Sequence, residues 1–384
     1  MLRTIGLMSG TSTDGVDAVL ARFALDAIDT TQAEPPLRWH VDAHVHRPFP
    51  EALRAELLAL NTSGPDELHR AALAANALVE VYAQAVHDLL RRTGLRASDV
   101  AAVGAHGQTV RHQPGAVDGV GYTVQLMQGA LLAERCGIDV VCDFRSRDVA
   151  AGGQGAPLVP AFHAVGFARP GQTLAVLNVG GIANLTRLCP GAPLLGFDSG
   201  PGNVLMDLWA HRHTHQPCDL DGRWAAEGQI DETLLQVLME EPFLDLPPPK
   251  STGRDLFHAA WLDARLAEAA RRGPPPSNGD VMTTLTAFTA RSAALALSQW
   301  VGPVDACLVC GGGAANPTLM RHLAQALGPV PLRTTTEHGL PADQVEAAAF
   351  AWLAWMFLRR APAGHPTVTG ASGPRVLGAL YPAC

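Results

Sequence analysis

The sequence predicts a mixed α/β protein built from two units that share one order of elements. The chain has 384 residues, and at roughly 100–200 residues per domain this length suggests two domains. Short apolar segments typical of strands alternate with longer segments of helical periodicity along the whole chain. A glycine-bearing hairpin followed by alternating strands and helices begins near residue 4 and again near residue 172. Because the two halves differ in sequence, the repeat is one of element order.

The first unit opens with two partly alternating segments around a polar turn at residues 9–15, a pattern that predicts a β-hairpin. Leu, Ala and Val then recur at three- and four-residue spacing, which predicts two helices, the second ended by Gly94. The elements expected here are strands at 4–8, 16–23 and 39–46, helices at 51–60 and 67–93, strands at 100–106 and 122–126, a helix at 128–136 and a strand at 138–142.

The second unit repeats this order with its own glycine-bearing turn at residues 180–184. A further glycine turn, Gly311 to Gly313, follows a buried strand and precedes a helical segment. The elements expected here are strands at 174–179, 185–188 and 196–198, a helix from 203, a long helix at 283–300, a strand at 306–310 and a helix after the last turn.

Composition and charge exclude several classes of function. The formal net charge is -8 and no Lys/Arg-rich block occurs, so nucleic acid is not expected as a main partner. The N-terminus turns polar by Ser9, and the longest apolar run, Ala347 to Leu358, is only 12 residues long. We therefore expect no signal peptide and no membrane span, and interpret this run as a buried helix.

The seven cysteines are scattered and odd in number, which favours a reducing, cytoplasmic setting. Cys307 and Cys310 form a lone CxxC in an apparent strand, where packing in the core is favoured over a zinc or redox role. The histidines show no metal-binding spacing, so a structural zinc is not expected.

The polar hairpin turn Gly10-Thr11-Ser12-Thr13-Asp14-Gly15-Val16-Asp17 is the strongest local signal of chemistry. Small residues let a backbone approach a polyphosphate, hydroxyls and amides can donate to its oxygens, and an aspartate can order Mg²⁺. The segment lacks the GxxxxGK[ST] pattern of a P-loop. A phosphate-binding loop and a plain hairpin turn are both compatible with it.

Two other segments allow a functional and a structural interpretation. Gly311-Gly312-Gly313 could lie against a nucleotide or could be a tight strand-to-helix turn, and it does not fit the dinucleotide fingerprint. Asp198 follows a strand and precedes two glycines and a proline, so it could be a general base held on rigid backbone. It could equally cap the helix that follows.

Two polar segments each follow a strand in the first unit. They are Gly104 to His112 and Asp143 to Asp148, and their dense hydrogen-bonding side chains suit sugar hydroxyls. Any single histidine in them could instead be structural.

Taken together, these segments resemble the anhydro-N-acetylmuramic acid kinase family over nearly the whole chain. The matching stretches are MSGTSTDGVD (8–17), GAHGQTVRHQP (104–114), DFRSRDVAAGGQGAPLVP (143–160), NVGGIANLT (178–186), GFDSGPGN (196–203), PPKSTGRDLF (248–257), TLTAFTA (284–290), CGGGAANPTLM (310–320) and EAAAFAWLA (346–354). Ser199 stands where the family more often has Thr, a departure that leaves the neighbouring acid untouched.

The resemblance implies two actin-like (ribonuclease H-like) domains on either side of a central nucleotide and substrate cleft. We place the first domain at residues 1–160 plus about 360–384, and the second at residues 161–359. The resemblance also implies a cytoplasmic homodimer that acts in cell-wall recycling and converts 1,6-anhydro-N-acetylmuramic acid, water and ATP, with Mg²⁺, to N-acetylmuramic acid 6-phosphate and ADP.

The resemblance assigns roles residue by residue. Asp198 is implied as the catalytic base, which would activate a water to attack C1 while O6 leaves toward the γ-phosphorus. The residues implied to bind ATP are Gly10, Thr11, Ser12, Thr13, Asp14, Gly15, Val16, Asp17, Gly180, Gly181, Asn184, Gly311, Gly312, Gly313 and Asn316. Those implied to bind the sugar are His106, Gln108, Thr109, Arg145, Asp148 and Glu346.

Two other functions remain compatible with the residues. The first is a kinase of the same fold that acts on an ordinary sugar alcohol or a carboxylate. The second is an actin-like or Hsp70-like ATPase whose domain motion drives partner binding.

Overall fold

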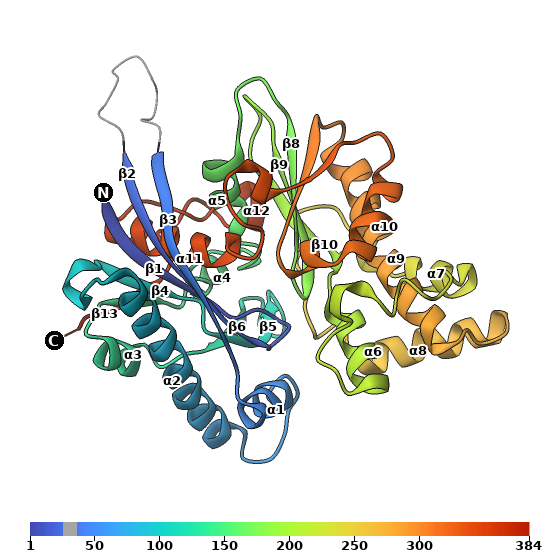
Figure 1. The fold of residues 1–384 in the computed structure, drawn as a ribbon, viewed down its shortest axis with the longest axis horizontal. Helices are drawn as coiled ribbons and strands as arrows, with labels where there is room; N and C mark the ends of the chain where they lie inside the picture. Colours follow the sequence, from blue (N-terminus) through green and yellow to red (C-terminus); the bar gives the residue numbers. More distant parts are fainter. Residues whose placement is uncertain (26–36, 384) are drawn as a thin grey trace. The chain divides into compact units, whose positions relative to one another are not determined.

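A computed structural model describes residues 1–25 and 37–383 and divides them between two compact units (Figure 1). The first unit comprises Met1–Val165, Gln344–Pro366 and Gly370–Cys384, and the second comprises Gly166–Asp343 and Thr367–Thr369. The sequence placed residues 344–359 in the second domain, and this assignment is wrong because the apolar helix that they form packs on the first unit's sheet.

The first unit holds a mixed sheet, a separate two-stranded hairpin and the helices that cover the sheet. Its strands are β1 (Leu2–Met8), β2 (Gly15–Leu25), β3 (Leu37–Pro48), β4 (Ala102–Ala105), β5 (Gln108–Pro114), β6 (Gly121–Leu126), β7 (Val140–Cys142) and β13 (Ala379–Tyr381). Its helices are α1 (Glu51–Ala59), α2 (Glu67–Thr93), α3 (Gly129–Cys136), α4 (Ser146–Ala150) and α11 (Val345–Leu358). Helix α5 (Val159–Phe167) contains the division between the two units.

The sheet of the first unit has the strand order β13-β7-β4-β1-β2-β3. Strands β1, β2 and β3 form an antiparallel meander, and β4 and β7 run parallel to β1 on its other side. One face is covered by α2, whose buried Leu78, Tyr82 and Leu89 contribute to an apolar core with strand residues such as Ile5 and Leu7.

Helix α11 covers the opposite face of this sheet, and two paired glycines let it come close (Figure 1). Gly6 and Gly104 are register partners on β1 and β4. A Cβ at Gly6 would lie 1.9 Å from the carbonyl oxygen of Ala347, and one at Gly104 would lie 2.2 Å from that of Phe350. Because any side chain here would collide with the helix backbone, these glycines are required for the packing of α11 on the sheet.

The second unit holds a five-stranded sheet and a larger group of helices. Its strands are β8 (Leu174–Val179), β9 (Ile182–Leu188), β10 (Leu195–Pro201), β11 (Ala306–Cys310) and β12 (Leu332–Thr334). Its helices are α6 (Val204–Thr214), α7 (Glu232–Met239), α8 (Ala259–Arg272), α9 (Asn278–Ala296) and α10 (Pro317–Leu327), and the short α12 (Pro366–Thr369) lies mostly in this unit.

The two sheets share one topology. In the second unit the order is β10-β9-β8-β11-β12, with β8, β9 and β10 antiparallel and β11 and β12 parallel to β8. In both units, therefore, three meandering strands are followed by two parallel strands added beside the first. This is the ribonuclease H-like order, and it confirms the expected fold class.

Several local predictions are confirmed. Helix α2 has the predicted bounds and ends at Gly94, whose φ of 68° is left-handed. Cys307 and Cys310 are fully buried on β11, as core packing requires. The run from Ala347 to Leu358 lies within the buried α11. Within residues 1–25 and 37–383, no helix has both the length and the apolar character to cross a membrane.

Candidate active site

Two side chains of the segment after β4 form hydrogen bonds with backbone carbonyls of the loop that joins β1 to β2. His106 Nδ1 lies 3.1 Å from the carbonyl oxygen of Ser9, and Gln108 Nε2 donates to the carbonyl oxygen of Gly10 at 3.0 Å. In a trans peptide the carbonyl and the following amide point in opposite directions. The amides of Gly10 and Thr11 therefore point away from these two side chains, as a phosphate-binding loop requires.

Arg145 determines the tautomer of His106. Its guanidinium nitrogen Nη2 lies 2.9 Å from His106 Nε2, and since arginine can only donate, Nε2 accepts and Nδ1 carries the proton. Burial, and then the charge of Arg145, lower the pKa of His106 to about 3. His106 is therefore neutral at physiological pH and acts as a fixed link between Arg145 and the loop.

The two aspartates of the loop have different surroundings. Asp14 is exposed and accepts a hydrogen bond from Ser12 Oγ at 2.8 Å. Asp17 lies on β2, and its Oδ1 is 2.9 Å from His44 Nε2 and 3.1 Å from His46 Nδ1 on β3. Burial raises the pKa of Asp17, but the hydrogen bonds with both histidines outweigh it and hold the pKa below its ordinary value. A hydrated Mg²⁺ thus fits Asp14 better than Asp17.

The remaining predicted loop residues separate into open and packed positions. In the described part of the chain, the nearest atom to a Cβ at Gly10 would be Ser12 Oγ at 3.8 Å, so ligand atoms have room to approach. A Cβ at Gly15 would lie 2.4 Å from the carbonyl oxygen of Arg47, so this glycine is required by strand packing. The Val16 side chain is fully buried in the core.

The predicted sugar-binding residues also differ in exposure. Asp148 is fully buried, and its Oδ2 accepts from the amide of Gly155 at 2.8 Å, so it fixes the loop that follows α4. Thr109 Oγ1, on β5, accepts from Gln125 at 3.2 Å. Glu346 lies in the first turn of α11. Like Arg145, Thr109 and Glu346 are partly exposed.

Asp198 lies inside β10 in the second unit and is 5% exposed. Its Oδ2 accepts from the amide of Thr252 at 2.9 Å, and its own amide donates to the carbonyl oxygen of Lys250 at 3.2 Å. The strand pairing shifts register just after it, between Asp198 and Gly200. The N-cap of the following helix α6 is Asn203, so the alternative in which Asp198 caps that helix is wrong.

The turn between β8 and β9 contacts the start of α6. The carbonyl of Gly180 accepts from the amide of Asn203 at 2.8 Å, and the carbonyl of Gly181 accepts from that of Val204 at 3.1 Å. Asn184 lies directly opposite the aspartate in the β9–β10 register and is 8% exposed. This turn thus anchors the helix that follows the aspartate.

The triple-glycine turn is only partly open. Gly311 has a φ of 80°, and a Cβ there would lie 2.7 Å from the carbonyl oxygen of Val179. A Cβ at Gly313 would lie 2.5 Å from Val179 Cγ1, whereas Gly312 is exposed. Asn316 caps α10 by accepting from a backbone amide of its first turn. Close packing on β8 explains the outer two glycines, and Gly312 is the position with room for a ligand.

The profile of the family described as "Anhydro-N-acetylmuramic acid kinase" matches residues 2–383 of this chain. A protein of that name from Bordetella petrii is 60% identical over 380 residues, which cover 99% of this chain and 96% of the relative. The chain belongs to the anhydro-N-acetylmuramic acid kinase family. A second relative of that name, from Cupriavidus pinatubonensis, is 54% identical over 99% of this chain and 98% of its own length.

Solved structures outside the family show weaker similarity. An activator of 2-hydroxyisocaproyl-CoA dehydratase from Clostridium difficile, with bound ADPNP, has a TM-score of 0.41 and 13% identity and covers 92% of this chain and 94% of its own. A ROK family glucokinase from Streptomyces griseus, in complex with glucose and AMPPNP, has a TM-score of 0.39 and 13% identity, with 91% and 98% covered.

The family-like stretch PPKSTGRDLF contains a contact that the sequence did not predict. Lys250 is 4% exposed, and its Nζ donates to the carbonyl oxygens of Phe243 at 3.0 Å and Leu244 at 2.9 Å. Burial lowers the pKa of Lys250 to about 8, although the charges of Asp245 and Asp198 raise it. The available signal was a lysine between an apolar, proline-rich segment and a polar turn.

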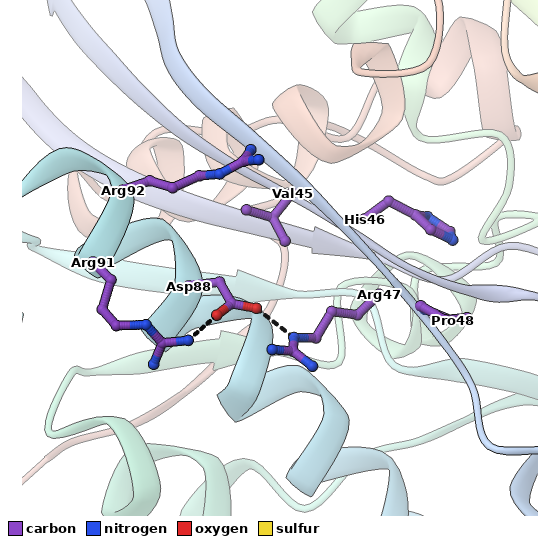
Figure 2. Close-up of a pocket in the computed structure, with 7 residues that line it drawn as sticks. All are labelled: Val45, His46, Arg47, Pro48, Asp88, Arg91 and Arg92. Carbon is purple, nitrogen blue, oxygen red and sulfur yellow. Dashed lines mark hydrogen bonds and ion pairs between the residues drawn. The ribbon is translucent and has the colours of Figure 1, made fainter.

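Figure 2 shows a pocket on the first unit, of about 440 Å³, beside the part of β3 that pairs with Gly15 to Asp17. It is lined by Val45, His46, Arg47, Pro48, Asp88, Arg91 and Arg92. Asp88 forms ion pairs with both Arg47 and Arg91, and Arg92 donates to the carbonyl oxygen of His44. All three arginines of the pocket thus bond to groups of the protein itself. We therefore interpret the pocket as a surface contact between β3 and α2, held by ion pairs.

Proposed function

We propose that this chain uses ATP and water to open the internal acetal of 1,6-anhydro-N-acetylmuramic acid and to phosphorylate O6. The products are N-acetylmuramic acid 6-phosphate and ADP, and the setting is cell-wall recycling. Family membership over residues 2–383 supports the reaction class. The observation that carries the proposal within the structure is Asp198, a buried carboxylate fixed on β10 by the backbone of residues 250–252.

Asp198 is the proposed general base. In this sugar O6 is bonded to C1, so there is no 6-hydroxyl proton for a kinase base to remove. Asp198 instead takes a proton from water, whose oxygen bonds to C1 as the C1–O6 bond breaks. O6 then bonds to the γ-phosphorus of ATP, and the bond from that phosphorus to the β-phosphate oxygen breaks. The amide of Thr252 orients the carboxylate during this step.

The loop from Gly10 to Asp14 is the proposed phosphate site. Its support is the pair of carbonyls held by His106 and Gln108, which turn the neighbouring amides outward. Asp14 is exposed and fits a hydrated Mg²⁺, which when bound would neutralise phosphate charge. Gly312 is the proposed contact for the nucleotide in the second unit, because it is the open glycine of its turn.

The candidate sugar residues receive two kinds of role. We assign direct contact with the sugar to the partly exposed Thr109, Arg145 and Glu346. We assign a supporting role to His106 and Asp148, whose side chains are buried against backbone groups. A homodimer in the cytoplasm remains part of the proposal, supported by the family resemblance.

Product mass tests this function. Purified protein is incubated with ATP, Mg²⁺ and the anhydro sugar, and separately with N-acetylmuramic acid that already has its 6-hydroxyl. We expect turnover with the anhydro sugar, and a product heavier than it by one phosphoryl group and one water. Phosphoryl transfer without added water would contradict the mechanism. Faster turnover of the open sugar would indicate an ordinary sugar kinase, and ATP hydrolysis without a phosphorylated sugar would indicate an ATPase.

A further inference from the structure

Lys250 is the only lysine in the sequence, whose other 27 Lys/Arg positions are all arginine. It is also buried, at 4% exposure, where a charged side chain is rare unless it has partners. The one lysine of the chain is thus at a buried position, whereas every other basic Lys/Arg position is an arginine. This contrast indicates that the shape or chemistry of the ammonium group matters at residue 250.

The ammonium group joins two segments of the second unit. Its two hydrogen bonds, at 3.0 and 2.9 Å, go to carbonyls of the 3-10 helix Pro242–Asp245. It also lies 4.7 Å from the centre of the Phe243 ring, within cation–π distance. A compact head with three donors can satisfy two adjacent carbonyls over a ring, whereas the planar guanidinium of arginine is longer and forked.

The backbone around Lys250 holds the carboxylate of Asp198. The carbonyl of Lys250 accepts from the amide of Asp198 at 3.2 Å, and the amide of Thr252 donates to Asp198 Oδ2 at 2.9 Å. Residues 250–252 therefore bracket the aspartate on both its backbone and its side chain. If the Lys250 ammonium were removed, the carbonyl of Leu244 would lose this donor, and the carbonyl of Phe243 would keep only the amide of Leu246 at 3.3 Å. This segment would then lose its side-chain link to the 3-10 helix.

We propose, on the basis of the function proposed above, that Lys250 is a positioning residue for Asp198. Its ammonium group ties residues 250–252 to the 3-10 helix, and these residues orient the carboxylate toward the attacking water. Its charge also lies within electrostatic reach of Asp198 and favours the ionised base.

The test is a double-mutant cycle with a matched structural control. Lys250→Met removes the ammonium group, Lys250→Arg keeps the charge but changes the head, and each is combined with Asp198→Asn. The control is Thr283→Val, because Thr283 is also 4% exposed and its hydroxyl also lies within hydrogen-bond distance of two backbone carbonyls, of Ala225 at 2.8 Å and Gly279 at 3.0 Å. All variants are assayed below their melting temperatures.

We expect Lys250→Met to lower kcat by about 10–100-fold, with KM for ATP and for the sugar within about threefold of wild type. In the Asp198→Asn background the same change should alter the residual rate by less than about twofold, because the group that it positions is already disabled. Lys250→Arg should lie between wild type and Lys250→Met. Thr283→Val should lower the melting temperature but leave kcat unchanged.

Wild-type kcat in folded Lys250→Met would overturn the proposal, and so would an equal, multiplicative loss in the Asp198→Asn background. If Lys250→Met does not fold, Lys250→Arg decides, because wild-type kcat there would exclude a need for the ammonium head. Failure of the proposed function would look different, since the wild-type protein itself would make no phosphorylated sugar.

Discussion

Individual polar residues of the candidate site are either buried, with a proposed supporting role, or partly exposed, with a proposed role in direct contact. His106 and Asp148 are at most 4% exposed, and each forms a hydrogen bond with a backbone group of a neighbouring loop. Arg145 and Glu346 are partly exposed, and Asp198 is buried but held by an amide. A variant at a supporting residue should therefore change loop geometry, whereas a variant at a contact residue should change binding or turnover alone.

Asp198→Asn should lower kcat by about 10²–10⁴-fold, because the amide keeps the shape of the side chain but cannot accept the proton. The Asn oxygen can still accept from the amide of Thr252, so the melting temperature and the affinity for ATP should remain close to wild type. Melting curves, ATP calorimetry and turnover measure the three quantities. A folded variant with near-normal turnover would remove the base from the mechanism.

Gly10→Val should weaken ATP binding by about tenfold or more, because the branched side chain would occupy space that phosphate needs. The fold should survive, since the nearest atom to a Cβ at Gly10 in the described chain is 3.8 Å away. Calorimetry with ATP measures the affinity, and circular dichroism checks the fold. Unchanged ATP affinity would show that this loop is a plain hairpin turn.

Among the elements, α11 comes late in the sequence but packs on β1, β2 and β4, which lie in its first third. Thr4 Oγ1 on β1 donates to the carbonyl oxygen of Ala351 on α11 at 2.8 Å. This hydrogen bond links the strand directly to the helix backbone. The same helix carries Glu346 in its first turn, so its seating on β1 and β4 also places a candidate sugar contact. The glycines under the helix thus allow the packing that also positions this candidate residue.

Gly6→Ala or Gly104→Ala should destabilise the protein by about 2–3 kcal/mol, because the added methyl group would overlap the backbone of α11. Gly279→Ala is the matched control: it lies in α9, and its nearest new contact would be an ordinary 3.5 Å to Trp224 Nε1. This change should cost no stability, since alanine favours a helix. Denaturant unfolding measures all three, and equal stability of the Gly6 and control variants would contradict the packing.

For the molecule as a whole, the same sheet order is built twice around two separate cores. The first core includes Leu20, Leu78 and Val103, and the second includes Phe197 and Phe288. The first unit is discontinuous in sequence, since Gln344–Pro366 returns to it after Gly166–Asp343 of the second unit. Its folding therefore requires segments that precede and follow Gly166–Asp343 in the sequence.

Truncation after Asp343 should unfold the first unit, because the apolar face of its sheet would lose α11. Circular dichroism and limited proteolysis should show loss of protected fragments from the N-terminal half. Removal of the last six residues is the control: it deletes β13, whose side chains are exposed at the sheet edge, and the three residues after it, and should leave the unit folded. Full protection of the N-terminal half in the longer truncation would contradict the division into units.

The sequence by itself determined the class of fold, most elements of the sheets and the set of candidate segments. Local periodicity and glycine or polar turns carry this information, as the bounds of α2 and β8 show. The family resemblance, which the profile match confirmed, came from the order and spacing of those same segments.

Only the tertiary structure decided which candidate residues are buried and which are exposed. Local pattern could not place α11 with the first unit, because its partners Gly6 and Gly104 are far away in the sequence. Nor could it show that Asp198 lies within a strand instead of capping a helix, or that Lys250 anchors the segment beside it. Long-range hydrogen bonds and close packing decide these roles, and neither leaves a periodic signal in the chain.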